Sequence, residues 1–122
     1  MAPHNLIQRP HGPALSMLLP PAELEIMRLV WTRGPLTVRA VHTQLAQQRP
    51  IAYTSTTMTM SRLAEKGLLH RESRHPRRRS SADTYTATID EQELISRAVQ
   101  QLIECIKNDY PAIIQYYFDA AV

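Results

Sequence analysis

The sequence predicts a mainly α-helical fold with one small β-hairpin. Apolar residues recur every three or four positions in several segments, the period falls to two after Gly67, and glycine or proline stands at most of the changes. The 122 residues suffice for one small domain with an appendage. No apolar run approaches the roughly 18 residues that a membrane span requires, and the N-terminus lacks the pattern of a secretory signal. We therefore expect no membrane insertion and a cytoplasmic location.

The first helix is predicted after a proline-rich N-terminal arm. Five of the nine prolines lie in the first 21 residues, so residues 1–17 are expected to form a flexible arm. Pro21 suits the first position of a helix, and Gly34 followed by Pro35 ends it. Between them the apolar stripe consists of Leu24, Met27, Val30 and Trp31.

Two more helices are predicted before Gly67. Thr37 can cap the first of them, and Pro50 prevents its continuation. Its apolar stripe is Val38, Val41 and Leu45. The next helix begins around Thr54 and ends at Gly67, and its inward stripe is Thr56, Met60 and Leu63. Serine and threonine are poor helix formers, so packing or function must hold this last helix in place.

A two-stranded hairpin is predicted after Gly67. Leu69 and Ser73 alternate with polar residues on one side of the tip HPRRRSSAD, as do Tyr85, Ala87 and Ile89 on the other. Three helices followed by a hairpin are the order of a winged helix-turn-helix domain, which we predict for residues 18–90. In that arrangement the third helix enters the major groove of DNA, and the hairpin, or wing, lies against the backbone.

The remaining segment, residues 91–122, predicts a helical dimerisation region. Asp90 and Glu93 form a capping box, and Pro111 opens a last helix. A chain this short cannot cover the wide apolar stripe of these helices by itself, so we expect a homodimer. The residues expected in its interface are Ile95, Val99, Leu102, Ile106, Ile113, Ile114, Tyr117 and Phe118.

The charge distribution points to a polyanion as partner. Residues 1–82 hold twelve basic and four acidic side chains, a net charge of +8, whereas residues 83–122 carry −5. A basic half of this kind typically faces nucleic acid, here double-stranded DNA. An alternative is a winged-helix module that binds protein through the acidic, aromatic end of the chain.

The outer face of the third helix and the wing supply the candidate DNA contacts. Short polar side chains let a helix approach base edges, while flanking cations hold phosphates. Candidates for the bases are Ser55, Thr57, Met58 and Thr59, and candidates for phosphates are Arg62, Lys66, Arg71, Arg74, Arg77, Arg78 and Arg79. Tyr53 and Thr54 stand at the start of the helix, where Tyr53 either packs beneath it or touches phosphate. The competing interpretation of each charged residue is a solvated surface.

Several segments of the chain resemble the penicillinase repressor family (BlaI/MecI/CopY). The matching segments are PAELEIMRLVW, GPLTVRAVH, AYTSTT and RLAEKGLL ahead of a basic hairpin, within residues 19 to 90. The resemblance implies a dimeric winged-helix repressor that binds a two-fold operator, with the C-terminal helices as the dimerisation region. For the β-lactam-responsive members, it also implies a membrane sensor protease as a partner.

The sequence departs from the family pattern in three respects. Pro20 stands where members usually carry a capping Thr or Ser, and Thr56, Met58 and Met60 replace a branched aliphatic residue, a threonine and a leucine. The operator therefore need not match a known one. Cys105 stands alone where copper-responsive members have a cysteine cluster, so copper sensing is not supported.

Enzymatic and metal sites are not expected. The sequence offers no carboxylate pair, activated nucleophile or glycine-rich phosphate loop. Its five histidines lack the spacing of a metal site, and Cys105 fits a packed free thiol better than a redox sensor. We therefore expect neither a metal nor another cofactor.

Overall fold

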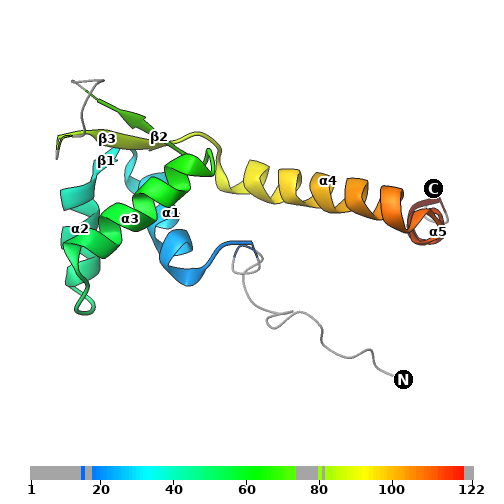
Figure 1. The fold of residues 1–122 in the computed structure, drawn as a ribbon, viewed down its shortest axis with the longest axis horizontal. Coiled ribbons are helices and arrows are strands. Elements are labelled where there is room, and N and C mark those ends of the chain that lie inside the picture. The colour runs from blue at the N-terminus through cyan, green and yellow to red at the C-terminus, as the bar shows by residue number, and fades with distance from the viewer. Residues whose placement is uncertain (1–14, 16–17, 74–79, 81, 120–122) are drawn as a thin grey trace. The chain divides into compact units, whose positions relative to one another are not determined.

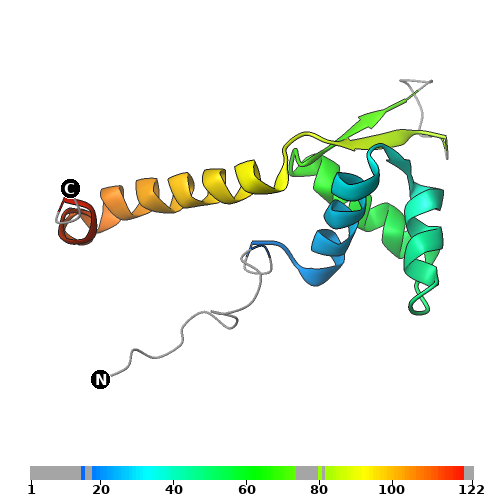
Figure 2. The same cartoon turned by 180° about the vertical axis from the view of Figure 1, so that it is seen from behind.

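Three helices and a small antiparallel sheet precede the long C-terminal helix (Figures 1 and 2). The computed structural model describes residues 15, 18–73, 80 and 82–119. The expected arm, residues 1–17, lies almost entirely outside them. The chain divides after Asp90 into two compact units, which are described one at a time.

Helix α1 (Pro21–Arg33) begins with a proline and ends at a glycine, as predicted. Pro20 gives its first turn no side-chain cap. Gly34 adopts a φ of 84°, and its amide donates a 2.8 Å hydrogen bond to the carbonyl of Val30. A positive φ is open to glycine and strained for other residues, which explains the sharp stop. The buried residues of α1 are Glu23, Leu24, Ile26, Met27 and Val30.

Helices α2 (Val38–Ala46) and α3 (Tyr53–Glu65) follow the predicted pattern. The Thr37 hydroxyl oxygen accepts a 3.1 Å hydrogen bond from the amide of Ala40, so the predicted cap is confirmed. Beyond α3, Gly67 takes a φ of 80°. The stripes expected to face inward are buried in both helices: Val38, Val41 and Leu45 in α2, and Thr56, Met60 and Leu63 in α3.

The sheet has three strands where the sequence predicts only a hairpin. Strands β2 (Leu69–Glu72) and β3 (Thr84–Ala87) form the expected antiparallel pair. The unpredicted strand is β1 (Leu36–Thr37), which pairs with the other edge of β3 and gives the order β1-β3-β2. A two-residue strand has no alternation of its own, so periodicity cannot reveal it. In both ribbon views α1, α2 and α3 lie on one side of this sheet.

The register of the sheet decides which side chains face the core. Leu69 lies opposite Ala87, and Arg71 lies opposite Tyr85. Residues directly opposite one another share a face of the sheet, and alternate residues of a strand do too. Leu69, Arg71 and Tyr85 are therefore on one face, and the first and last of these are buried.

A hydrogen bond joins the end of α1 to the segment that follows the sheet. The indole Nε1 of Trp31 donates a 2.8 Å hydrogen bond to the carbonyl oxygen of Ile89, 58 residues along the chain. Ile89 is itself buried. The apolar ring and its polar tip thus fasten the last residues of the first unit to its first helix.

The described part of the second unit is helical except at Tyr110. Helix α4 (Glu91–Asp109) is followed by α5 (Pro111–Ile114) and by a π-helical turn, Gln115–Asp119. Neither α4 nor α5 buries a residue. In the described part of the chain, no helix is both long and apolar enough to cross a membrane.

The hydroxyl of Thr56 is a poorly satisfied polar group in the core of the first unit, and it gives a test of the packing. Thr56 is 1% exposed, and its hydroxyl has no hydrogen-bond partner among the described residues. Valine has the same shape without the hydroxyl, so Thr56→Val should raise the free energy of unfolding by about 1 kcal/mol in urea titrations. The control is Thr57→Val, because the Thr57 hydroxyl already donates to the Tyr53 carbonyl at 3.1 Å. A gain in the control as large as in Thr56→Val would contradict this explanation.

Candidate nucleic-acid interface

Helix α3 is fixed by its buried stripe, so its opposite face is presented outward. Met60 and Leu63 are completely buried, and Thr56 is nearly so. Residues three and four positions apart share a helix face. Side chains of α3 outside this stripe are partly or fully exposed, among them Thr54, Ser55, Thr57, Met58, Thr59 and Arg62. The largest apolar one among them is Met58, which is 55% exposed.

The hydroxyl groups of two threonines on this face already donate hydrogen bonds to the backbone. Thr57 donates to the Tyr53 carbonyl at 3.1 Å, and Thr59 donates to the Ser55 carbonyl at 2.9 Å. A hydroxyl in this arrangement keeps lone pairs that can accept from a base amino group, but it does not donate to a phosphate. Thr57 and Thr59 are therefore better suited to reading base edges than to holding the backbone.

Tyr53 packs at the start of α3 while remaining partly exposed. Its ring meets the His42 ring edge to face, with centroids 5.4 Å apart. The Nε2 atom of His42 is also 2.9 Å from the Ile51 carbonyl oxygen, which ties α2 to the segment before α3. Tyr53 is 39% exposed, so packing beneath the helix start does not remove it from the surface.

Lys66, expected to hold phosphate, is paired with a buried carboxylate. Its Nζ lies 2.8 Å from Oε1 and 2.9 Å from Oε2 of Glu23. The side chain of Glu23 is 5% exposed, whereas that of Lys66 is 47% exposed. The pair connects the first turn of α1 to the residue just after α3. Each charge also suits its helix end, since a carboxylate is favoured at an N-terminus and a cation at a C-terminus.

Arg71 is held in the same way at the base of the wing. Its Nη1 lies 2.7 Å from Oδ2 of Asp83, whose side chain is 2% exposed. The Ser80 amide donates a 3.0 Å hydrogen bond to the same oxygen. This backbone hydrogen bond, together with those from the Ser73 hydroxyl and the Arg71 guanidinium, lowers the pKa of Asp83 from its ordinary value, although burial acts in the opposite direction.

The rest of the predicted wing cations are Arg74, Arg77, Arg78 and Arg79. They lie outside the residues that the structure describes. Of the phosphate candidates that are described, Arg62 alone is exposed without a carboxylate partner among the described residues.

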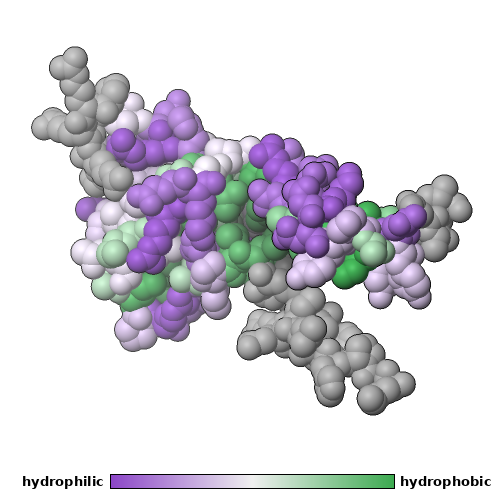
Figure 3. All heavy atoms as spheres, turned by 45° about the vertical axis from the view of Figure 1, so that its right-hand side comes forward, coloured by the Kyte–Doolittle hydropathy of each residue, from purple (hydrophilic) through white to green (hydrophobic). Residues whose placement is uncertain are grey.

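The residues expected in a dimer interface all lie in the second unit and none is buried. Val99 and Leu102 are 50% and 61% exposed. Figure 3 shows hydrophobic side chains, in green, among hydrophilic ones along the C-terminal helices. The other predicted interface residues are also partly or fully exposed: Ile95, Ile106, Ile113, Ile114, Tyr117 and Phe118.

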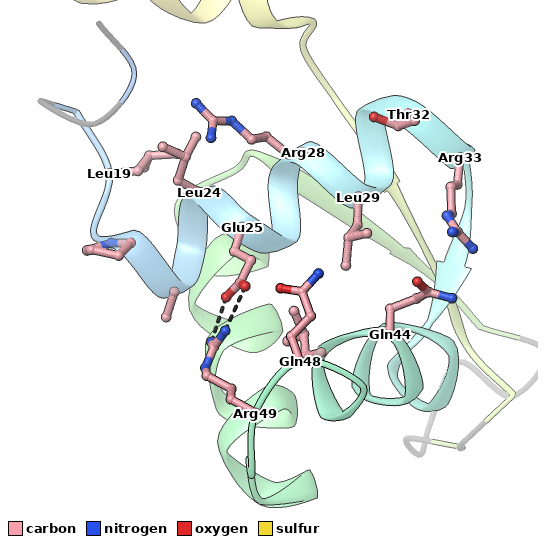
Figure 4. A pocket seen from close by; sticks show the side chains of 13 residues that line it. Leu19, Leu24, Glu25, Arg28, Leu29, Thr32, Arg33, Gln44, Gln48 and Arg49 are labelled. Atoms are coloured by element: carbon pink, nitrogen blue, oxygen red, sulfur yellow. Dashed lines mark hydrogen bonds and ion pairs between the residues drawn. The ribbon is translucent and has the colours of Figure 1, made fainter. Parts of the chain in front are cut away.

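A separate groove of about 930 Å³ lies between α1 and α2 (Figure 4). Its leucines Leu24 and Leu45 are already buried, and Gln44 points into it from α2. Arg49 closes it with two hydrogen bonds of 2.6 and 2.7 Å to the carboxylate of Glu25, which lower the pKa of that carboxyl. The buried leucines of this groove belong to the core and its rim is charged, whereas a typical ligand pocket presents a concave, mostly apolar surface.

The described residues hold no group of three or more histidine, cysteine, aspartate or glutamate side chains placed to bind a metal ion. Cys105, expected to be a packed thiol, is exposed on α4 in this single chain.

Three packed helices and a three-stranded antiparallel sheet that includes the wing hairpin define a winged-helix domain, and α3 with its exposed polar face is the helix that such domains place on DNA. The profile of the family described as penicillinase repressor matches residues 19–120. The chain belongs to the penicillinase repressor family, whose members are DNA-binding transcriptional repressors and not enzymes.

A solved structure has the same fold. The transcriptional regulator Tm0710 from Thermotoga maritima is 21% identical to this chain, with a TM-score of 0.50. The match covers 88% of this chain and 77% of that one. No curated protein matches the sequence.

Sequence reasoning missed the two buried carboxylates. Glu23 precedes Met27 by four residues and Val30 by seven, so it lies on the same helix stripe as these buried side chains. An acid on an apolar stripe requires a cationic or hydrogen-bonding partner, and that signal was available. The burial of Asp83 could not be predicted in this way, because it depends on how the wing packs in the folded unit.

The lowered pKa of Asp83 predicts a component of acid sensitivity. A carboxylate that titrates lower in the folded state contributes stability above its ordinary pKa, and this contribution is lost as the pH falls through the folded value, below about pH 4. Asp83→Asn should therefore lower the urea midpoint at pH 7 and reduce its further decrease toward pH 3.

The control for Asp83→Asn is Glu72→Gln, which removes an exposed carboxylate from the same sheet. It should keep the acid dependence of the unchanged protein. An Asp83→Asn variant whose midpoint falls with pH as steeply as that of the unchanged protein would contradict the assignment.

Proposed function

We propose that this protein is a homodimeric, sequence-specific repressor that binds an inverted-repeat DNA operator. Helix α3 lies in the major groove, where Ser55, Thr57, Met58 and Thr59 face the bases. Arg62 and the wing arginines beyond Arg71 lie along phosphates: Arg74, Arg77, Arg78 and Arg79. The exposed polar face of α3 opposite its buried stripe is the observation that carries the proposal.

The exposed apolar stripe of the second unit supports a dimer. Helix α4 has 19 residues and buries none of them, whereas most of the stability of a helix in a protein comes from packing of its apolar face. A second copy would cover the stripe, and two-fold symmetry would then place two α3 helices on half-sites one or two turns apart, about 10 base pairs for each turn.

The family resemblance supports two further parts of the proposal. A cytoplasmic location agrees with DNA as the partner. For release from the operator, a membrane sensor or protease is the partner that the family suggests.

Salt dependence tests the DNA-binding proposal. Binding to duplex DNA should weaken steeply as salt rises, because each neutralised phosphate releases counterions. Arg62→Ala should weaken binding to every duplex and reduce the log-log slope by about 0.9, the contribution of one phosphate, in fluorescence anisotropy titrations.

Arg97→Ala is the matched control for Arg62→Ala. It removes the same charge from α4, where Arg97 pairs with Glu93 at 2.9 Å, and it should leave the slope unchanged. A flat salt response of the unchanged protein would instead favour the alternative, a winged-helix module that binds protein.

Sedimentation tests the dimer. Leu102→Asp places a charge in the centre of the exposed stripe and should give monomers in analytical ultracentrifugation. The control, Gln101→Asp, introduces the same charge at the neighbouring exposed position and should remain dimeric. A Leu102→Asp variant that sediments as a dimer would refute this interface.

A further inference from the structure

The two described ion pairs of the DNA-binding surface share one design. In each, a cation exposed to solvent is bonded to a carboxylate that is almost completely buried: Lys66 to Glu23 and Arg71 to Asp83. The cation side chains are 47% and 27% exposed, whereas the carboxylates are 5% and 2% exposed. Water, or a ligand that approaches from solvent, can therefore contact the cations but not the carboxylates.

Transfer of either cation from its carboxylate to a phosphate would carry a large free-energy cost. Moving Lys66 or Arg71 to a phosphate would leave a buried carboxylate without its cationic partner, and removing one partner of a buried ion pair is strongly destabilising. In addition, Arg71 lies on the face of the sheet that carries the buried Tyr85, so its register directs it toward the protein. Both cations also have their charge already neutralised.

We propose that Glu23 and Asp83 are positioning residues that hold Lys66 and Arg71 on the protein, so that neither replaces a counterion on the DNA backbone. The inference rests on the proposed DNA binding. Its consequence is a lower affinity for DNA of any sequence than the basic residues alone would give. The contacts of the outer face of α3 then account for more of the discrimination between sequences.

The placement of the pairs fits this role. Glu23 and Lys66 come from PAELE and AEKG, two of the segments that carry the family resemblance, and their pair joins α1 to the end of α3. Asp83 and Arg71 join the two long strands at the base of the wing. Each pair therefore orients one of the two elements that would approach DNA.

The test releases one cation at a time and measures binding to a 20-base-pair duplex of random sequence. Glu23→Gln keeps the shape of the side chain but removes its charge, so Lys66 becomes free to bind a phosphate. The log-log salt slope should become steeper by about 0.9, which makes the loss of affinity between 50 and 200 mM salt about three- to four-fold larger. Asp83→Asn should do the same through Arg71.

Two controls separate the freed cation from other effects. Glu23→Gln in a Lys66→Met background should leave the slope of the Lys66→Met protein unchanged. Glu65→Gln removes one negative charge from the exposed last residue of α3. If the steeper slope of Glu23→Gln comes from the freed Lys66 and not from the overall charge, Glu65→Gln should change the slope by much less than 0.9.

A measurement on the unchanged protein does not depend on whether the variants fold. The NMR signal of the Lys66 ammonium should keep its position when duplex is added, while signals of the exposed face of α3 shift. A Lys66 signal that shifts with them overturns the inference, and so does a folded Glu23→Gln variant with an unchanged slope. An unchanged protein that does not bind duplex in a salt-dependent way overturns the proposed function itself.

Discussion

The burial of one side of α3 is the constraint on which the rest of the first unit depends. Threonine and serine give this helix little intrinsic stability, and packing of Met60 and Leu63 against the other helices and the sheet must supply the difference. A rotation of the helix by one residue, about 100°, would expose those side chains to water. The identity of the outward face is therefore fixed by the core, even though no core residue reaches that face.

Three contacts tie α1, the end of α3 and the wing together within the first unit. The Trp31 indole fastens the end of α1 to Ile89, Glu23 fastens the start of α1 to Lys66, and Asp83 fastens β3 to Arg71. Two of these three contacts bury a carboxylate, which is costly unless it is paired. Their value lies in geometry, because a buried charge allows few positions for its partner. If α3 and the wing bind DNA as proposed, this restriction would help them to match the spacing of grooves and phosphates.

The sequence predicted the parts of this fold that have a period, a cap or a stop. Thr37 caps its helix, Gly34 and Gly67 take positive φ values, and the expected stripes of α2 and α3 are buried. In the stripe expected for α1, Leu24, Met27 and Val30 are buried, whereas Trp31 is half-buried. Strand β1 was missed because two residues carry no period. The face of α3 could be predicted in the same way, since it is the complement of a stripe. The pairing of Lys66 could not, because contacts between residues 43 positions apart depend on how the helices pack.

The basic and acidic residues are unevenly divided between the two units, and each unit pairs or exposes its charges differently. The first unit contains most of the basic residues, but two of them are paired with buried acids, so a count of cations overstates the unpaired positive charge of this unit. In the second unit, acidic side chains flank an uncovered apolar stripe. Two such helices repel through their charged faces and attract through their apolar ones. In the proposed homodimer, the stripe would supply the attraction and the acidic side chains would restrict how a second copy can dock.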